Sequence, residues 1–224
     1  MRALLPLILM AATTLSAQSY SVDGSCLVHL PPKLSEHAPV LVLFDPGGDA
    51  AGALRRVAPA GDGNGVVLVV STAFRNGLDD AAYARMLSDL KAMLTRRFPD
   101  SPIWSGGFSG GARMSVGWAQ QEHGWIRGVL CFGAFYDRGG LPPGGTPVFL
   151  ACGTGDFDRP EMERAREALM QSGRKVVWKP FLGGHQWPPQ EVIQDALRFV
   201  AEQSPARVPT AAGPRSADGD PVHR

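Results

Sequence analysis

Long apolar runs, an excess of charge of one sign, and cysteine are all scarce in this sequence. The chain of 224 residues has a formal net charge of +1 and 19% charged residues. It therefore lacks the basic surface that typifies nucleic-acid binding, and no nucleic-acid partner is expected. The apolar opening run, residues 3–15, is shorter than the about 20 residues that a membrane span needs. A hydrophobic content of 44% is nevertheless enough to bury the core of one sizeable domain.

The opening run has the layout of a secretory signal peptide. Arg2 supplies a positive charge before it, and small residues up to Ala17 follow it, ahead of polar Gln18. This pattern predicts a signal peptide over 1–17 and a mature chain, without a membrane span, that is secreted or periplasmic. An uncleaved anchor or a lipoprotein signal is the alternative, but Cys26 lies too far past the run for a lipid-modified cysteine.

Only three cysteines are present, Cys26, Cys131 and Cys152, and an odd number leaves at least one thiol unpaired. Cys131 and Cys152 lie in apolar, strand-like runs, where cysteine usually behaves as a small buried hydrophobe. Buried free thiols are the preferred interpretation, and a disulfide between these two is the alternative. No cysteine stands in a turn beside a general base, so a catalytic cysteine is not expected.

Segments of strand type and helix type alternate along the chain. Apolar runs predict strands at 26–30, 39–44, 65–72, 103–105, 128–135, 147–152 and 175–181. Helical periodicity predicts helices at 79–97, 112–121, 160–172 and 189–201, and a short, weak one at 51–57. The alternation predicts a single α/β domain over 18–203, with a mostly parallel sheet covered by helices on both faces. A polar, Pro- and Gly-containing segment over 204–224 is expected to be disordered.

A glycine-rich segment follows the predicted strand at 103–105. It reads Gly107-Phe108-Ser109-Gly110-Gly111, which matches the pattern Gly-x-Ser-x-Gly. A sharp turn from strand to helix exposes the serine hydroxyl but crowds the residues two before and two after it, and glycine relieves this crowding. Ser109 is therefore the candidate nucleophile, and an ordinary tight turn is the alternative.

A nucleophilic serine needs a histidine base and an acid that orients the histidine. His185 is the candidate base because it directly follows a predicted strand, in Gly183-Gly184-His185. Asp156 is the candidate acid, in the loop after the strand at 147–152. Asp158 is the alternative acid, although it is better placed to cap the helix that begins near residue 160. The chain order Ser109, Asp156, His185 is the one expected for a strand-turn-helix nucleophile.

The anionic intermediate of acyl transfer needs at least two backbone N–H donors. The amide of Gly110, directly after the nucleophile, is the first candidate. The second is expected in the loop after residue 44, where Pro46 has no N–H, so that Gly47 or Gly48 remains and Gly47 is favoured.

These motifs resemble the α/β-hydrolase superfamily over residues 39–203. More narrowly, the segments around Ser109, Asp156 and His185 are similar to small secreted esterases of the polyhydroxybutyrate-depolymerase and feruloyl-esterase-like group and to dienelactone-hydrolase-type relatives. The resemblance implies an acyl-enzyme mechanism without a cofactor or a metal. One departure is that Asp45-Pro46 stands where many members have His-Gly. The short stretch 131–147 leaves no room for a large lid domain.

An open site without a lid is expected to take a small-molecule ester or the end of an ester polymer. Phe108, beside the nucleophile, and Trp187, beside the base, are the candidate substrate-binding residues. A peptidase or an acyltransferase with the same triad, or a non-catalytic binding module, are the alternatives. A dinucleotide-binding protein is not expected, because the loop after residue 44 lacks the spacing Gly-x-Gly-x-x-Gly.

Overall fold

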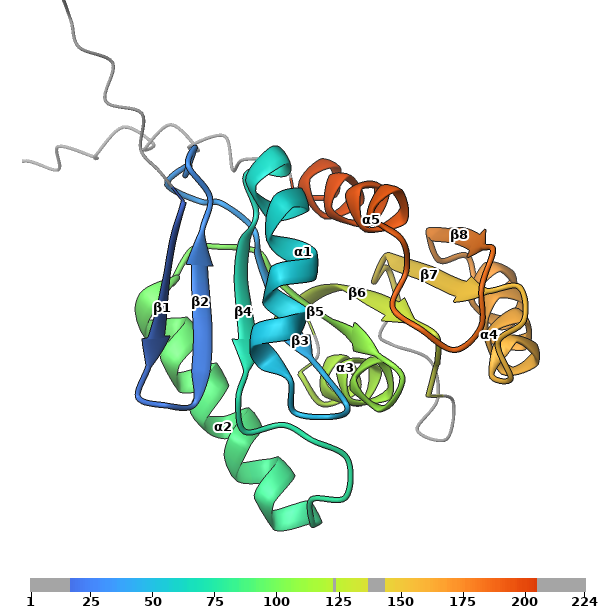
Figure 1. The fold of residues 1–224 in the computed structure, drawn as a ribbon, viewed down its shortest axis with the longest axis horizontal. Helices are drawn as coiled ribbons and strands as arrows, with labels where there is room; N and C mark the ends of the chain where they lie inside the picture. Colours follow the sequence, from blue (N-terminus) through green and yellow to red (C-terminus); the bar gives the residue numbers. More distant parts are fainter. Residues whose placement is uncertain (1–16, 123, 137–143, 205–224) are drawn as a thin grey trace, which may run out of the picture.

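The computed structural model describes residues 17–122, 124–136 and 144–204 (Figure 1). The predicted signal peptide, apart from Ala17, and the predicted disordered tail, apart from Ser204, lie outside these residues. In the part that is described, the strands form one 8-stranded sheet in the order β1-β2-β4-β3-β5-β6-β7-β8. The chain thus forms a single sheet with helices packed against it.

The strands and helices alternate much as predicted. The strands are β1 (Gln18–Val22), β2 (Cys26–Leu30), β3 (Val40–Phe44), β4 (Val67–Ser71), β5 (Ile103–Phe108), β6 (Ile126–Phe132), β7 (Val148–Gly153) and β8 (Val176–Phe181). The helices are α1 (Ala50–Asn64), α2 (Asp80–Arg97), α3 (Gly110–Gln121), α4 (Arg159–Gln171) and α5 (Gln190–Glu202). Only residues 133–147 separate β6 from β7, which leaves no room for a large lid.

The sheet is mostly parallel, as the alternation predicts. β2 pairs antiparallel with β1 and β4, and every pairing from β4 across to β8 is parallel. The carboxyl ends of β3, β5, β6, β7 and β8 therefore meet at one edge of the sheet, where ligands bind in such folds. β1 was not predicted, because it is short, mostly polar and exposed on its outer side.

Helices cover both faces of the sheet (Figure 1). On one face α1 and α5 pack through Val57 and Leu197 on side chains such as Leu41. On the other face α2, α3 and α4 pack through residues such as Leu90 and Trp118. Because β3 is buried on both faces, all five of its residues are apolar.

Helix α1 is longer than predicted. The sequence predicts a short, weak helix at 51–57, but the helix runs from Ala50 through Pro59 to Asn64. Gly61 is needed for close packing rather than for a turn, since a Cβ there would lie 2.9 Å from a methyl carbon of Leu68. Gly65, in the left-handed conformation with φ of 66°, ends the helix. Contact with the sheet thus outweighs the low helix propensity of these residues.

A buried histidine connects β1 and β2 to α1. His29, on β2, lies 2.8 Å through its Nδ1 from the hydroxyl of Ser19 on β1. Its Nε2 lies 2.8 Å from Oδ1 of Asp62 on α1. This Ser19–His29–Asp62 chain ties the edge strand to a helix of the core.

All three cysteines are free and buried, so the preferred interpretation of the sequence is confirmed and the Cys131–Cys152 disulfide is not formed. Burial raises the pKa of the Cys152 thiol to about 11 and raises the pKa of the Cys131 thiol further still. Thiols so far from ionisation are unreactive at neutral pH.

Candidate active site

Ser109 stands in a sharp turn between β5 and α3. Its backbone has φ of 52° and ψ of −120°, a conformation that residues other than glycine rarely adopt and that typically costs about 1–3 kcal/mol. The hydrogen bond from its N–H to the Phe132 carbonyl, 2.8 Å, holds the turn against β6. The turn lifts the hydroxyl away from the sheet at the carboxyl end of β5.

The two glycines that flank the serine are sterically required. A Cβ on Gly107 would lie 2.5 Å from the carbonyl oxygen of Phe44, and a Cβ on Gly111 would lie 2.0 Å from the same oxygen. Both distances are far below van der Waals contact, and the obstacle is backbone that cannot move aside. The turn therefore fits only glycine at these positions, for the reason that the motif implies.

The structure brings Ser109, His185 and Asp156 together from three loops. The Ser109 hydroxyl lies 2.9 Å from Nε2 of His185, and Nδ1 of His185 lies 2.9 Å from Oδ1 of Asp156. His185 follows β8 and its side chain is 18% exposed, whereas the Asp156 side chain, after β7, is fully buried. A buried carboxylate thus orients an imidazole that solvent can still reach.

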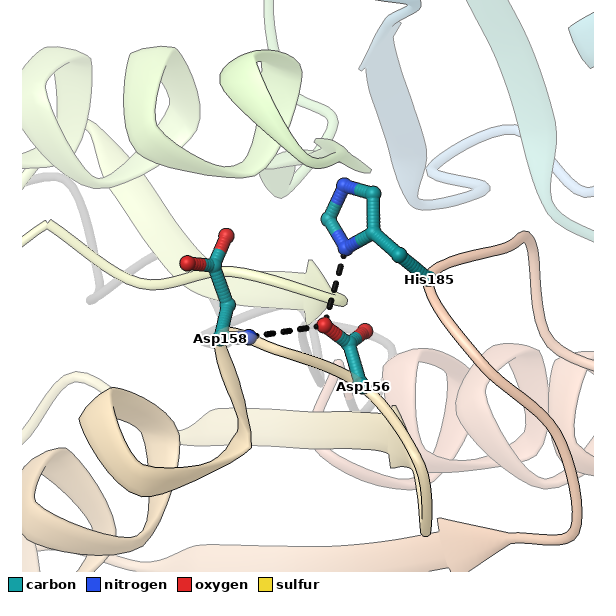
Figure 2. Close-up of side chains that lie close together, drawn as sticks. All are labelled: Asp156, Asp158 and His185. Atoms are coloured by element: carbon teal, nitrogen blue, oxygen red, sulfur yellow. Dashed lines mark hydrogen bonds and ion pairs between the residues drawn. The ribbon is translucent and has the colours of Figure 1, made fainter.

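Asp158, the alternative acid, is engaged elsewhere. Its carboxylate pairs with Arg113 of α3 at 3.1 Å, and it makes no side-chain cap to α4, contrary to the prediction. Figure 2 shows its backbone N–H, 2.9 Å from Oδ1 of Asp156, bonded to that carboxylate. Arg113 also pairs with Glu161 at 3.0 Å. The cation therefore holds Asp158 and leaves Asp156 facing His185.

Asp156, Asp158 and His185 are close enough to suggest metal ligands, since their ligand atoms lie within 4.8 Å of one another. Their hydrogen bonds account for the cluster in another way. His185 already faces Asp156, and Asp158 is paired with Arg113. Oδ2 of Asp156 is buried and has no hydrogen-bond partner among the described residues, so most of the carboxylate's interaction is with His185 and the Asp158 amide.

Comparison with known proteins gives matches in structure but none in sequence. No protein-family model matches the chain, and no curated protein matches it significantly. The Francisella virulence factor BioJ matches with a TM-score of 0.67 at 11% identity, over 84% of both chains. A carboxylesterase from Bacillus cereus matches with a TM-score of 0.62 at 18% identity, over 80% of this chain and 93% of that one.

An S-formylglutathione hydrolase from Staphylococcus aureus matches with a TM-score of 0.60 at 12% identity, over 83% of this chain and 98% of that one. The chain has the α/β-hydrolase fold. At identities this low, the structural matches establish a shared fold only. Activity depends on the residues at the site.

The loop after β3 differs from the expectation drawn from the sequence. The Gly47 N–H donates to Oδ1 of Asp45 at 2.9 Å, and the Gly48 N–H donates to the Asp45 carbonyl at 3.1 Å. Gly47, the favoured second oxyanion donor, is thus already engaged, and so is Gly48. The amide of Gly110, in contrast, begins α3 and has no acceptor within the helix. One of the two expected donors is available.

Asp45 also connects this loop to the histidine loop. Its Oδ2 accepts a hydrogen bond from Nε1 of Trp187 at 3.2 Å, and the residue is only 8% exposed. The Asp45 carboxylate therefore fixes a loop on either side of the Ser109 hydroxyl.

Phe108 and Trp187, the predicted substrate-binding residues, lie next to the base. The Phe108 ring centroid is 4.8 Å from that of His185 and 5.7 Å from that of Trp187. Both side chains are partly buried and pack against the core cluster on the side of α1 and α5. Phe108 packs against the His185 ring, and Trp187 packs against Phe108. Contact of either residue with a substrate stays a prediction.

Phe157, which lies between the two candidate acids, is a residue of the site that was not predicted from the sequence. Its ring centroid is 4.2 Å from that of His185, and the residue is 73% exposed. Leu182, on the neighbouring loop, is 93% exposed. A large apolar residue inside an otherwise polar loop was the signal that could have found Phe157.

A cleft of about 580 Å³ opens between α2 and α3. It extends from Gly110 and Asn76 along α3, and its lining is largely apolar and aromatic: Phe74, Tyr83, Leu87, Met114, Trp118 and Tyr136. Trp118, which is buried in the core with 1% exposure, also borders this cleft. The volume is in the range that accommodates small organic ligands.

Across the part of the chain that the structure describes, none of the helices combines the length and the apolar character that a membrane crossing requires.

Proposed function

We propose that the protein is a serine hydrolase that cleaves a carboxylic ester through an acyl-enzyme intermediate. The observation that carries the proposal is the unbroken hydrogen-bonded chain from Ser109 through His185 to Asp156, with each bond 2.9 Å long. Its serine stands in a strained strand-to-helix turn, next to the free amide of Gly110. An exposed hydroxyl, a base, a buried acid and an oxyanion donor are the parts that such chemistry needs.

In the first half of the reaction, Ser109 Oγ attacks the carbonyl carbon of the ester while its proton passes to Nε2 of His185. The carbonyl electron pair moves onto the oxygen, which accepts a hydrogen bond from the Gly110 N–H. When the pair returns, the bond to the alcohol oxygen breaks, and His185 protonates the leaving alkoxide. Asp156 stabilises the imidazolium that exists between these two steps.

In the second half, a water molecule adds to the acyl carbon and gives its proton to His185. The tetrahedral intermediate collapses, the carboxylic acid leaves, and Ser109 Oγ recovers the proton. No cofactor takes part in these steps. The names of the structural neighbours, a carboxylesterase and an S-formylglutathione hydrolase, support ester-type substrates.

The absence of room for a large lid favours a small soluble ester or an exposed polymer end as substrate. A peptidase or an acyltransferase would use the same three residues, and amide substrates and alternative acyl acceptors test these alternatives. A non-catalytic binding module is disfavoured because no member of the triad has been lost.

We further propose that the mature enzyme is exported and begins at Gln18, after removal of residues 1–17. The first strand, β1, begins at Gln18. Expression of the full chain in a bacterial host, followed by intact-mass analysis of the exported protein, tests this. A mass that still includes residues 1–17 contradicts it.

The central experiment is intact-mass analysis after treatment with a fluorophosphonate, beside a Ser109→Ala control. We expect the wild type to gain one probe mass and to hydrolyse p-nitrophenyl acetate, and the control to do neither. A folded wild type that stays unlabelled and inactive would overturn the proposal and favour a binding role on a hydrolase scaffold.

A further inference from the structure

The oxyanion requires a second hydrogen-bond donor, and the loop after β3 does not offer one. The N–H groups of Gly47 and Gly48 both donate to Asp45. Pro46, directly before Gly47, has no N–H at all. A hydrolase of the kind proposed above would therefore stabilise its intermediate with the Gly110 amide alone, unless a side chain supplies another donor.

Asn76 places an unpaired amide beside Gly110. A Cβ built on Gly110 would lie 2.0 Å from Oδ1 and 2.9 Å from Nδ2 of Asn76, so this side chain occupies the space that a side chain after the nucleophile would fill. The residue is exposed, and its amide has no hydrogen bond to any residue that the structure describes. Glycine at position 110 is what admits it.

The Asn76 backbone is held in place. Its N–H donates to the carbonyl oxygen of Pro46 at 2.9 Å, which anchors the loop between β4 and α2 to the loop after β3. The side chain, in contrast, can rotate. Because a Cβ lies about 2.5 Å from its own backbone nitrogen, an oxygen bound to the Gly110 N–H lies near the Asn76 amide. Oδ1 is the nearer amide atom, and rotation about the Cβ–Cγ bond, which exchanges the positions of Oδ1 and Nδ2, directs the N–H at that oxygen.

The same two residues form the inner end of the cleft between α2 and α3. A carbonyl group held between their amides would have one of its two substituents directed along this cleft. The walls there combine aromatic and apolar side chains with the polar Asp80, Arg113 and Gln121. Helix α3 contributes Gly117, where a Cβ would meet nothing within 4 Å. The cleft therefore has room for a group of the size of a phenylalkyl chain.

We propose that the ester binds with its carbonyl oxygen between the Gly110 N–H and the Asn76 side-chain amide, and with an aromatic or other apolar substituent in the cleft between α2 and α3. This inference rests on the proposed function and names the substrate class: esters with a bulky apolar group on one side of the carbonyl. As Ser109 Oγ bonds to the carbon, the electron pair displaced onto the oxygen is stabilised by both N–H donors.

The first test replaces the donor. Loss of one oxyanion donor typically lowers kcat by about 10²–10³-fold, so we expect Asn76→Ala to lower kcat on this scale with KM within about threefold. Asn76→Asp keeps the size but replaces the amide with a carboxylate and is expected to lose at least as much. Both variants are expected to bind a trifluoromethyl ketone, which forms a tetrahedral oxyanion adduct, more weakly by the same factor.

The control is Asn64→Ala, the same substitution at the far end of α1, where the side chain donates to the Ala60 carbonyl. We expect it to lower Tm slightly and to leave kcat unchanged. If Asn76→Ala retains wild-type kcat and wild-type affinity for the ketone, the role of Asn76 is overturned.

The second test fills the cleft with Gly117→Phe and compares three esters by acid release: ethyl acetate, ethyl 4-phenylbutyrate and 4-phenylbutyl acetate. The last two are isomers, with the phenyl group on the acyl side or the alcohol side. We expect the wild type to prefer one isomer over ethyl acetate, and the variant to lose about tenfold in kcat/KM on that isomer alone. The preferred isomer identifies which side of the ester enters the cleft.

Gly63→Phe is the matched control, since Gly63 is an exposed helical glycine of α1, where a Cβ would have only an ordinary contact, 3.7 Å, with Gln194. If the wild type and Gly117→Phe have the same kcat/KM for each of the three esters, the substituent does not bind in this cleft, and that part of the proposal is wrong. If the wild type hydrolyses no ester and resists the fluorophosphonate, the proposed function itself fails. If it is active while the Asn76 and Gly117 variants match it, only the present inference fails.

Discussion

Two serine–histidine–aspartate chains run through this molecule, and their hydrogen bonds have nearly the same lengths. In the chain Ser109–His185–Asp156 both bonds are 2.9 Å, and in the chain Ser19–His29–Asp62 both are 2.8 Å. The histidine nitrogens are used in opposite ways, because Nε2 of His185 and Nδ1 of His29 face the serine.

The surroundings of the two serines differ far more than their hydrogen bonds. Ser109 has a positive φ, stands before the first turn of α3 and lies where the parallel strands end. Ser19 lies in an extended edge strand, in register with His29 on the neighbouring strand. Among the described residues no helix begins beside Ser19, so no row of free helix amides there faces its hydroxyl. Hydrogen-bond lengths alone therefore do not distinguish a nucleophile from a structural tie, whereas the backbone around the serine does.

The largest expected difference is in the two serines themselves. Ser109→Ala should lower kcat/KM for p-nitrophenyl acetate by a factor on the order of 10⁴ or more, as for other triads. Ser19→Ala should stay within about twofold of wild type, because it removes one hydrogen bond far from the reaction. Equal losses in the two variants would show that the comparison is wrong.

Replacement of the two aspartates should also have very different effects on kcat. Asp156→Asn should lower kcat by about 10⁴-fold, since an amide neither holds the neutral imidazole in the correct tautomer nor stabilises the imidazolium. Asp62→Asn, at the partly exposed end of the other chain, should leave kcat unchanged and lower the free energy of unfolding by about 1 kcal/mol. Steady-state kinetics and urea denaturation of each variant measure the two effects.

The turn around Ser109 can be broken without touching the triad. Gly111→Ala places a Cβ 2.0 Å from the Phe44 carbonyl oxygen, so we expect a loss of about 1–3 kcal/mol in the free energy of unfolding and a severe loss of activity. Gly63→Ala, at an exposed helical position of α1 where a Cβ would have only an ordinary contact of 3.7 Å with Gln194, is the control and should cost neither. A fully active Gly111→Ala would show that the strained turn is dispensable.

The Ser19–His29–Asp62 chain should matter for stability alone. His29 is 5% exposed, and its replacement by alanine leaves both partners without a hydrogen bond, at a cost of about 1–3 kcal/mol. We expect a decrease in Tm of a few degrees with unchanged kcat, measured by calorimetry and ester hydrolysis. Lost activity in a variant of normal Tm would give this chain a functional role.

The smallest expected effect concerns the reactivity of two cysteines, one near each of the two serine–histidine–aspartate chains. Burial raises the pKa of Cys26, on β2, and raises that of Cys152, just before the Asp156 loop, to about 11. Only the thiolate reacts, so about one thousandth of Cys152 is reactive at pH 8, and its alkylation should speed up about tenfold per pH unit until pH 11.

Iodoacetamide followed by mass spectrometry measures these rates. We expect slow labelling of the native protein and three additions after denaturation. Ser19→Ala should speed up labelling of Cys26 and leave that of Cys152 unchanged. Rapid labelling of Cys152 in the native wild type would contradict its burial.

The sequence by itself determined the features that a few adjacent residues encode. Gly107 and Gly111 specify the turn at Ser109 because only glycine fits there, and the apolar runs specify buried parallel strands and hence one edge where the loops meet. The order Ser109, Asp156, His185 could be predicted for this reason, since each residue follows a recognisable strand.

Only the tertiary structure decided matters that depend on contacts between distant segments. Arg113 pairs with Asp158 and leaves Asp156 for the histidine. Asp45 engages the amide of Gly47, which the sequence predicts as the second oxyanion donor. Asn76 lies beside Gly110 although the two residues are far apart in the sequence, so no local sequence pattern predicts their contact. Helix α1 extends through Pro59 because it packs on the sheet. Local backbone strain and periodicity are properties of neighbouring residues, whereas which donor meets which acceptor is settled only when the chain is packed.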